Sequence, residues 1–370
     1  MNKELIEKVT EMMHPHPVYL VGGAVRDYIM GNEPKDYDFC TPATPDEIEK
    51  CIKDENRRAY LTGKRFGTLA CKIDGEMVEI TTFRTETYEP GNRKPEVEYV
   101  NSITADLSRR DFTMNAMAIR FTKGHLKIID PFEGEEDIQR KVIKTVGFAK
   151  QRFKEDPLRI LRAIRFAAKY GFEIEEQTLK KLKKMTPHLI DISKERWMIE
   201  FDKILTSTYT TIGLQLCWEN EVFKWTIPEL QMQYNYEQNS KYHDYTLHQH
   251  TKMVVNECPK ELNMRWAALF HDIAKPFVRT DKEITVTAKT EYSDFEMNEI
   301  KSNYIGHEIL GAEMVLKYAS YLKWSNDRKN TVYWLVRDHL EDGSKLRQYD
   351  NMCKKKQKDN DEPKKETKTD

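Results

Sequence analysis

The sequence predicts an α+β protein in which a small mixed-sheet domain precedes a longer, all-helical part. Before Pro131, short apolar runs alternate with polar residues and are separated by turn signals such as Asp74-Gly75. After Pro131, apolar residues recur at helical spacing, and a length of 370 residues allows two or three domains. We expect a mixed-sheet head at 1–130, a helical neck at 131–228, a second helical domain at 229–346 and a disordered charged tail at 347–370.

The head should contain helices and strands in alternation. In chain order we expect a helix at 1–13, a strand at 18–22, a helix at 23–30, a strand at 37–40, a helix starting at Thr44-Pro45, a hairpin of 67–73 with 77–84, and strands at 114–121 and 127–129. Residues 85–100 are polar, contain two prolines and predict a mobile loop that carries Arg93-Lys94.

The remainder should be helical. Helices are expected at 135–140, 156–169, 175–184, 193–206 and 211–220, with a boundary near 228–245 and further helices to about 345. The segment from Lys354 onward contains no apolar residue, which is typical of a disordered tail.

Composition excludes several classes of protein. Sixty basic residues nearly balance 61 acidic ones, so a nucleic-acid partner would need a local basic surface. The six cysteines form no C-x-x-C pair and predict reduced thiols in a cytoplasmic protein. The N-terminus lacks the apolar stretch of a secretion signal, and no apolar run approaches 18 residues, so we expect no membrane span.

A glycine pair followed by two aspartates is the most informative pattern of the head. Gly22 and Gly23 open the run GGAVRD, and Asp36 and Asp38 follow in DYDF. Residues i and i+2 of a strand point to the same side, so two carboxylates there repel each other unless a cation lies between them. Mg²⁺ prefers such oxygen ligands together with substrate phosphates, and glycines let backbone N–H groups approach a phosphate. The alternative is a solvated strand end.

Further residues complete this candidate site. Arg26 can bind a phosphate with two parallel hydrogen bonds, whereas Asp27 is expected to cap or orient the helix. Glu79 in VEITTFR is the candidate third carboxylate, because Val78 and Ile80 would face the opposite side of the strand; an exposed strand residue is the equal alternative.

The segment SRRDFTMNA, from Ser108, is a second candidate site. Arg109, Arg110 and Asp111 can hold a triphosphate and a ribose, and at most one of the arginines is expected to reach the same ligand group as Asp111. The alternative is a capping cluster in which Asp111 begins a helix.

The segment EDPLRILRAIRF, from Glu155, predicts a helix with one basic and one apolar stripe. Asp156 and Arg159 are three residues apart and share a face, and Arg162 extends the basic stripe. An amphipathic helix with surface ion pairs explains the pattern. Alternatively, Asp156 and Arg159 offer an acceptor and donors to a nucleobase edge, which would select a base without a template.

In the second helical domain, His250, the pair His271-Asp272 and the pair Asp338-His339 predict a metal site. We take His250, His271, Asp272 and Asp338 as its ligands, although His339 competes with Asp338 and His307 could join. Isolated histidines are more often core or surface residues.

These segments resemble the class II tRNA nucleotidyltransferases, or CCA-adding enzymes, and the related bacterial poly(A) polymerases. Five segments, spread over residues 16–206, arrive in the family's order: GGAVRDYIMG with DYDF, RRDFTMNAMA, DPFEG at 130–134, EDPLRILRAIRFAAKYGF and SKERWMIEFDKIL from Ser193. The segments around His250, His271 and Asp338 resemble an HD domain.

The resemblance implies a palm-like nucleotidyltransferase head and assigns roles by position. Asp36 and Asp38 would bind Mg²⁺ with Glu79 beside them, while Gly22, Gly23 and Arg26 would hold the triphosphate. Arg110 and Asp111 would read the ribose, Asp156 and Arg159 would pair with the base, and Arg162 would support the site. The loop at 85–105 would help to switch specificity from C to A.

The implied activity is addition of C, C and A from CTP and ATP to the 3′ end of tRNA, by two-metal phosphoryl transfer with pyrophosphate release. A poly(A) polymerase or a CC- or A-adding specialist is the nearest alternative. A phosphohydrolase working through the HD domain, with a second divalent metal (Mg, Mn, Ni or Fe), is the alternative from another class, and the domain could equally be a helical body that grips tRNA.

Overall fold

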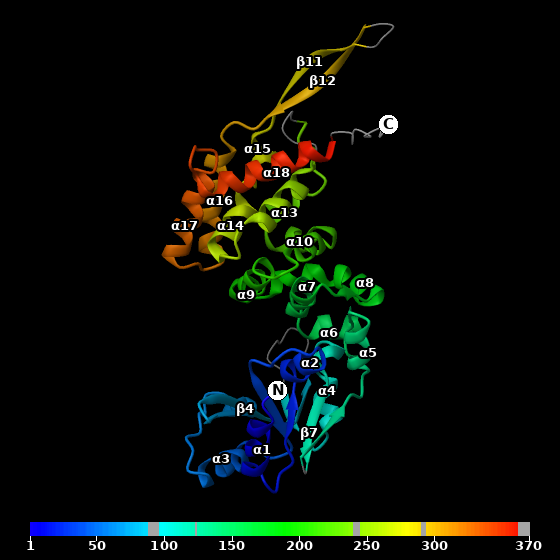
Figure 1. The fold of residues 1–370 in the computed structure, drawn as a ribbon, viewed down its shortest axis with the longest axis vertical. Helices are drawn as coiled ribbons and strands as arrows, with labels where there is room; N and C mark the ends of the chain where they lie inside the picture. Colours follow the sequence, from blue (N-terminus) through cyan, green and yellow to red (C-terminus); the bar gives the residue numbers. More distant parts are fainter. Residues whose placement is uncertain (88–95, 123, 240–244, 290–293, 362–370) are drawn as a thin grey trace, which may run out of the picture. The chain divides into compact units, whose positions relative to one another are not determined.

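The computed structural model describes residues 1–87, 96–122, 124–239, 245–289 and 294–361 (Figure 1). The chain forms two compact units. The head unit comprises Met1–Arg159 and Phe172–Leu182, and the helical unit comprises Ile160–Gly171 and Lys183–Asp370. The expected α+β class, a mixed-sheet head followed by a helical body, is confirmed.

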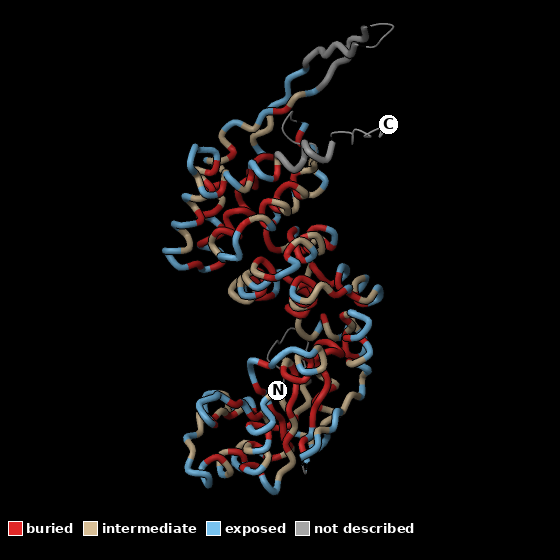
Figure 2. Tube along the Cα trace, in the orientation of Figure 1, coloured by how far each residue is buried: buried red, intermediate tan, exposed pale blue. Residues whose placement is uncertain are grey.

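A six-stranded mixed sheet, in the order β3-β4-β2-β1-β7-β8, forms the centre of the head unit. Only the β2–β4 pair within this sheet is parallel. The strands are β1 (Tyr19–Val21), β2 (Tyr37–Thr41), β3 (Thr68–Ile73), β4 (Glu76–Thr82), β7 (Ala118–Thr122) and β8 (His125–Ile129). Tyr37 and Phe39 of β2 and Val78 and Ile80 of β4 are buried, and Figure 2 draws the buried residues of the chain in red. Asp38 and Glu79 are exposed and lie on the other face of the sheet.

The head unit also contains short helices. They are α1 (Lys3–Met12), α2 (Gly23–Ile29), α3 (Pro45–Asp54), α4 (Ile103–Ser108), α5 (Gly134–Gln139), α6 (Ala149–Glu155) and α8 (Glu176–Met185), with single 3₁₀ turns η1 (Lys64–Phe66) and η2 (Thr113–Asn115). Thr44 begins α3 with the expected start signal, since its hydroxyl accepts from the Glu47 N–H while the Glu47 carboxylate accepts from the Thr44 N–H. A two-stranded parallel pair, β9 (Val142–Ile143) with β10 (Glu173–Ile174), completes the unit.

The helical unit buries a cluster of aromatic side chains. Its elements are α7 (Leu158–Tyr170, whose first turn belongs to the head unit), η3 (Thr186–Asp191), α9 (Lys194–Leu205), α10 (Thr210–Glu219), α11 (Val222–Thr226), α12 (Pro228–Gln231), α13 (Leu247–Glu257), α14 (Leu262–Phe270), α15 (Lys275–Val278), β11 (Thr280–Lys289), β12 (Asp294–Asn303), α16 (His307–Tyr321), α17 (Asn326–Arg337) and α18 (Lys345–Asp361). Phe201 stacks on Phe223 at 5.9 Å between ring centroids and meets Trp266 edge-on at 6.3 Å. The indole N–H of Trp266 donates to Asp202 at 2.7 Å, so the buried polar group is satisfied.

Two expectations about irregular segments were wrong. The tail expected to be disordered from residue 347 forms helix α18 up to Asp361, because Leu346, Asp350 and Cys353 recur at helical spacing and are buried. The second helical domain also contains a long antiparallel hairpin, β11 with β12, whose strands alternate polar and apolar residues around Val286 and Met297.

The other differences lie in the head unit. The ends of the expected loop at 85–100 pair as β5 (Arg84–Thr87) with β6 (Glu96–Tyr99), and Arg93 and Lys94 lie outside the described residues. The strand expected from Met114 begins only at Ala118, because Thr113–Asn115 forms η2. Helix α6 was not expected.

No helix in the described part of the chain is long and apolar enough to cross a bilayer.

Candidate functional site

Three carboxylates gather on one face of the head sheet. Asp38 lies on β2 directly opposite Glu79 on the parallel strand β4, and Asp36 lies one residue before β2 begins. Residues in register on neighbouring strands point to the same side, so Asp38 and Glu79 are adjacent, as the sequence predicts. Partial desolvation and the negative charges of Glu79 and Asp36 raise the pKa of Asp38, which the positive charge of Arg110 opposes. We call Asp36, Asp38 and Glu79 the carboxylate group.

Gly22 lies between the carboxylate of Asp38 and the guanidinium of Arg110. It has φ +70° and begins α2, and a Cβ placed on it would lie 3.3 Å from Nη1 of Arg110 and 4.0 Å from Oδ2 of Asp38. A side chain at this position would be strained and would crowd Arg110. The Arg110 guanidinium and the Asp38 carboxylate therefore both lie next to Gly22, and the missing side chain keeps the space between them open.

Arg26 is anchored inside the head. Its Nη1 donates to Oδ1 of Asn115 at 2.7 Å, and its Nε donates to Oδ1 of Asp27 at 2.9 Å. Asn115 in turn donates to Oδ1 of Asp111 at 3.1 Å, and Asp111 is only 7% exposed. Asn115 thus joins two predicted site residues. Its sequence pattern alone indicated no role for it, although it lies in the segment SRRDFTMNA together with Asp111.

Asp106 is a second residue that the sequence analysis missed. It is fully buried, and its two oxygens accept from Nη2 of Arg109 at 2.8 Å and from Nη2 of Arg110 at 3.2 Å. Although burial alone would raise it, the pKa of Asp106 is lowered by these two arginines. Its position one turn before the arginine pair on a helix is the signal that could have identified it.

The two adjacent arginines share Asp106 but differ in their other neighbours. Arg109 donates to Glu86 on β5 at 2.8 Å and to Asp106, whereas Arg110 lies beside Gly22. The carbonyl oxygen of Arg109 accepts from Nη2 of Arg159 at 3.0 Å. The backbone of Arg109 and Arg110 therefore links Arg159, at the start of α7, to the Arg110 guanidinium beside the carboxylate group.

Asp156 and Arg159 lie at the start of α7. Oδ1 of Asp156 accepts from the N–H of Leu158 at 3.1 Å, which caps the helix. Nη1 of Arg159 donates to Oε2 of Glu155 at 2.8 Å and to the carbonyl oxygen of Arg152 at 3.1 Å. The guanidinium is thus held in one orientation by backbone and Glu155. Arg162 follows one turn later on α7, with its guanidinium carbon 5.7 Å from the centre of the Phe166 ring.

A buried cluster of histidines and aspartates lies within the helical unit. It consists of His250, His271, Asp272, His307, His339 and Asp350, which we call the histidine–aspartate cluster. His250 lies on α13, His271 and Asp272 follow α14, His307 begins α16, His339 follows α17 and Asp350 lies on α18. Every member is at most 6% exposed.

The cluster corrects one predicted ligand. Asp338 belongs to neither ligand group of the cluster, and the neighbouring His339 takes the place expected for it. The reason is local, since Nδ1 of His339 lies 2.7 Å from the carbonyl oxygen of Val336, which directs its other ring nitrogen inward to within 3.2 Å of His307. Asp350 was missed because its segment was expected to be disordered.

Charges within the cluster perturb its ionisation. Burial lowers the pKa of His339 to about 3. Burial would raise the pKa of Asp272, but His271 and Lys275 hold it well below its usual value. Burial opposes a charge on His271 too, but the negative charge of Asp272 raises the pKa of His271, so the two histidines shift in opposite directions.

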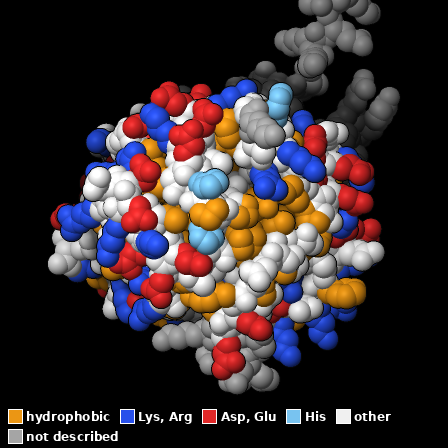
Figure 3. All heavy atoms as spheres, turned by 90° about the horizontal axis from the view of Figure 1, so that it is seen from below, with side chains coloured by type: hydrophobic (Ala, Val, Ile, Leu, Met, Phe, Trp, Pro, Cys, Tyr) orange, Lys and Arg blue, Asp and Glu red, His pale blue; other side chains and the backbone are white. Residues whose placement is uncertain are grey.

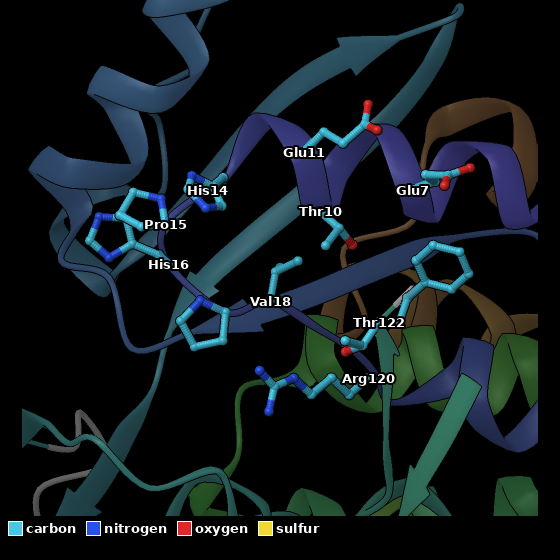
Figure 4. Close-up of a pocket in the computed structure, with 11 residues that line it drawn as sticks. Glu7, Thr10, Glu11, His14, Pro15, His16, Val18, Arg120 and Thr122 are labelled. Atoms are coloured by element: carbon cyan, nitrogen blue, oxygen red, sulfur yellow. The ribbon is translucent and has the colours of Figure 1, made fainter. Parts of the chain in front are cut away.

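A surface pocket of the head unit contains none of the predicted site residues. Its volume is about 360 Å³, and Figure 4 shows the side chains that line it. Figure 3 shows one face of the molecule, on which histidine and apolar side chains lie together. The lining residues are Glu7, Thr10, Glu11, His14, Pro15, His16, Pro17, Val18, Arg120, Phe121 and Thr122. This pocket is therefore not the candidate site for nucleotide transfer.

Comparison with known proteins agrees with this organisation. Residues 18–144 match the poly A polymerase head domain, residues 171–233 match the probable RNA and SrmB-binding site of polymerase A, and residues 249–368 match the HD domain. A CCA-adding enzyme of Bacillus cytotoxicus is 43% identical over 229 residues, covering 62% of this chain and 55% of the relative. The chain thus matches about half the length of this curated relative.

Solved structures share the fold. A tRNA nucleotidyltransferase complexed with a primer tRNA and an incoming ATP analog superposes with a TM-score of 0.63 at 22% identity, covering 96% of both chains. The Bacillus stearothermophilus CCA-adding enzyme in complex with CTP gives a TM-score of 0.60 at 23% identity, covering 96% of this chain and 81% of the other. The chain thus matches a poly A polymerase head domain, an RNA-binding domain of polymerase A and an HD domain in succession, and it is similar to curated proteins named CCA-adding enzymes.

Proposed function

We propose that this chain adds C, C and A from CTP and ATP to the 3′ end of tRNA without a nucleic-acid template. The observation that carries the proposal is the carboxylate group on adjacent strands, with Arg110 and the open space at Gly22 beside it. Its curated relatives are named CCA-adding enzymes, which favours tRNA over other RNA ends. Six free thiols agree with a reducing, cytoplasmic location.

The carboxylate group fits Mg²⁺. It consists of hard oxygen ligands. Desolvation and the negative charges of Glu79 and Asp36 raise the pKa of Asp38, so a divalent cation would stabilise the ionised form. Asp36 and Asp38 would hold the ions, with Glu79 beside them. Bound Mg²⁺ would make the RNA 3′-hydroxyl a better nucleophile and offset charge on the departing pyrophosphate.

The protein's own residues would position the nucleotide. The backbone at Gly22 and Gly23, with the Arg110 guanidinium, would receive the triphosphate. Arg26 would act through Asn115, which holds Asp111 toward the ribose. Most catalysis of phosphoryl transfer comes from such positioning and electrostatic stabilisation.

Base selection would take place at the start of α7. Asp156 would accept from the exocyclic amino group that cytosine and adenine share, and Arg159 would donate to the ring acceptors, with Arg162 as support. The bonds from Arg159 to the Arg109 carbonyl and to Glu155 favour a guanidinium that is already oriented before a base arrives. The segment between β5 and β6 would help to change the choice from C to A.

Incubation of a tRNA that lacks CCA with CTP, with ATP and with both tests the proposal. We expect two added residues with CTP alone and the complete CCA only with both nucleotides. A long A-tail with ATP alone would identify a poly(A) polymerase, and addition of only C or only A would identify a specialist.

The second candidate function is hydrolysis of a phosphoester at the histidine–aspartate cluster with a bound divalent metal. The burial of six metal-ligand side chains in one place favours it, because such residues are costly to bury without a cation. Mg, Mn, Ni and Fe all accept this mixture of imidazole and carboxylate. This activity would be additional to nucleotide transfer.

A further inference from the structure

We propose that a surface of the head unit formed by Phe148, Lys150 and Lys154 binds the unpaired 3′ end of the acceptor RNA. We call these three residues the phenylalanine–lysine patch. The phenyl ring stacks on a nucleobase of the strand, and the two ammonium groups contact its phosphates. The inference names acceptor-binding residues for the proposed nucleotide transfer and rests on that proposal.

The patch lies in a basic stretch of a chain whose total charge is balanced. Residues 140–154 contain six lysines and arginines and no acidic residue, whereas the whole chain has 60 basic and 61 acidic residues. A nearly neutral chain attracts RNA through a local excess of positive charge of this kind. The basic surface that an RNA partner requires is therefore present in the head unit.

The two lysines of the patch are available to a ligand. Lys150 and Lys154 lie four residues apart on α6, so their side chains share one face of the helix. Both are exposed, and neither forms an ion pair with any residue that the structure describes. About 6 Å of helix separates them, which suits two successive phosphates of a strand.

Phe148 supplies an aromatic ring to the same surface. It is 82% exposed, more than any other large apolar side chain in the described part of the head unit. A single exposed apolar side chain does not by itself indicate a ligand. Here the ring stands two residues before Lys150, and rings combined with cations are how proteins hold unpaired nucleotides without reading their sequence. A Cβ placed on the preceding Gly147 would meet no atom within 4 Å, so the space there is open too.

Other residues of α6 fix the segment to the head unit. Phe153 is fully buried, and Nη1 of Arg152 donates to the carbonyl oxygen of Ser108 at 3.2 Å. Nη2 of Arg152 pairs with Glu155 at 2.9 Å. The patch residues are therefore exposed on a segment that is already held in place, and a surface ordered before binding loses little conformational entropy when a strand arrives.

Along the chain, the patch lies between two elements of the candidate nucleotide site. The N–H of Val146, two residues before Phe148, donates to the carbonyl oxygen of Asp111 at 3.1 Å. After Phe148, the carbonyl oxygen of Arg152 accepts from Nη1 of Arg159 at 3.1 Å. Asp111 and Arg159 are expected to hold the ribose and the base of the incoming nucleotide. The end of the acceptor RNA has to arrive beside that nucleotide.

A single strand fits the patch better than a duplex or a free nucleotide. The bases of a duplex are stacked inside it and offer no face to a ring, whereas an unpaired end does. The triphosphate of the incoming nucleotide is expected at Gly22 and Gly23, so it does not require the two lysines. The occupant is therefore the RNA end that is to be extended.

RNA binding by the full chain in the absence of nucleotide tests the ring. The probe is an acceptor-stem hairpin with a short unpaired 3′ end that carries 2-aminopurine at each unpaired position in turn. Phe148→Ala should raise the Kd about 5–100-fold, the size of one base–aromatic stack, and should abolish the quenching of 2-aminopurine at one position. Phe148→Trp should restore both, whereas Phe148→Leu should not. An unchanged Kd in Phe148→Ala, or restoration by leucine, would overturn the proposal.

Lys150→Ala combined with Lys154→Ala tests the phosphate contacts. The slope of log Kd against log salt concentration should fall by about 1.4, the value for two contacts to a single strand. A blunt hairpin without unpaired nucleotides should bind this variant and the unaltered chain alike. An unchanged slope would contradict the phosphate contacts, and equal weakening for the blunt hairpin would place the patch on the duplex and overturn the proposal.

Phe277→Ala, and Lys3→Ala combined with Lys50→Ala, are the matched controls. Phe277 is a 45% exposed phenylalanine of α15, and Lys3 and Lys50 are exposed lysines of the head unit. These variants should retain the Kd and the salt slope of the unaltered chain. Losses equal to those of the patch variants would show that the patch has no special role.

Steady-state kinetics separate this inference from the proposed function. In Phe148→Ala the KM for CTP at saturating RNA should be unchanged, because the ring holds the acceptor. A raised KM for CTP with an unaltered Kd for RNA would assign the ring to the incoming base and overturn the inference. If the unaltered chain adds no nucleotide, the proposed function fails while the binding results stand. CCA addition with unaltered RNA binding in the patch variants would exclude the patch alone.

Discussion

The two candidate sites hold their ligands in opposite ways. The carboxylate group lies on two adjacent strands and is exposed, while the histidine–aspartate cluster draws its members from separate helices and is buried. An exposed group can exchange its cations with each substrate, since Mg²⁺ commonly arrives with phosphates. A buried group should retain its cations permanently. We therefore expect a substrate-linked cation at the carboxylate group and a resident cation at the histidine–aspartate cluster.

The largest effect is expected from a substitution in the carboxylate group of the head unit. Asp38→Ala should lower the rate of CMP addition by roughly 10²-fold or more, because an electrostatic group at the reacting phosphate is lost. The melting temperature should not fall, since the substitution removes repulsion from Glu79. Incorporation assays and calorimetry measure both quantities.

Asp46→Ala is the control for this prediction, because Asp46 is an exposed carboxylate on α3. It should retain the rate of the unaltered chain. Equal losses in the two variants would show that Asp38 has no special role.

Arg159→Ala tests base selection. We expect the preference for CTP over UTP in kcat/KM to fall by about 10–100-fold, the size of one bidentate base contact, with a smaller change in tRNA affinity. Lys169→Ala, on the same helix, is the control. Preserved selectivity would exclude the start of α7 as the base-reading element.

Asp106→Asn tests how the head holds its arginines. Removing one partner from this buried ion group should cost about 3 kcal/mol of stability at neutral pH, the lower end for such pairs because both arginines are partly exposed. The pKa of Asp106 is lower in the folded chain than its usual value of 3.8, so its contribution is complete above that value and is lost as pH falls through the folded-state pKa.

Denaturant titrations between pH 2 and pH 7 measure this dependence. The difference in unfolding free energy between the variant and the unaltered chain should shrink toward acid pH. A difference that is independent of pH would mean that the charge of Asp106 is not what stabilises the head.

The smallest effect is expected from Glu86→Gln. This change weakens the ion pair between β5 and Arg109, whose carbonyl oxygen holds Arg159. The discrimination between CTP and ATP at the last step should change only a few-fold, since a pair of this kind contributes about 1 kcal/mol. Product sequencing measures the ratio of C to A added at the last step. An unchanged ratio would show that the β5–β6 pair does not influence the choice of base.

Local patterns explain which expectations about the fold were right. Strands β2 and β4 and the turn at Asp74-Gly75 follow from alternation and turn chemistry, both of which depend on neighbours in sequence. Helix α18 was missed because its few apolar residues, such as Leu346 and Cys353, are widely spaced among charges. The β11–β12 hairpin was missed because the surrounding pattern is helical.

The chain's own order of residues determined the α+β class and the resemblance to CCA-adding enzymes, and it indicated Glu79 as a partner for Asp38, because each depends on short-range periodicity or on contiguous motifs. Tertiary structure alone decided that Asp106 joins the two arginines, that Asn115 links Arg26 to Asp111, and that Asp350 and His339 rather than Asp338 complete the histidine–aspartate cluster. The physical reason is that side-chain direction at a helix end, and the docking of distant helices onto one another, depend on packing that no local pattern encodes.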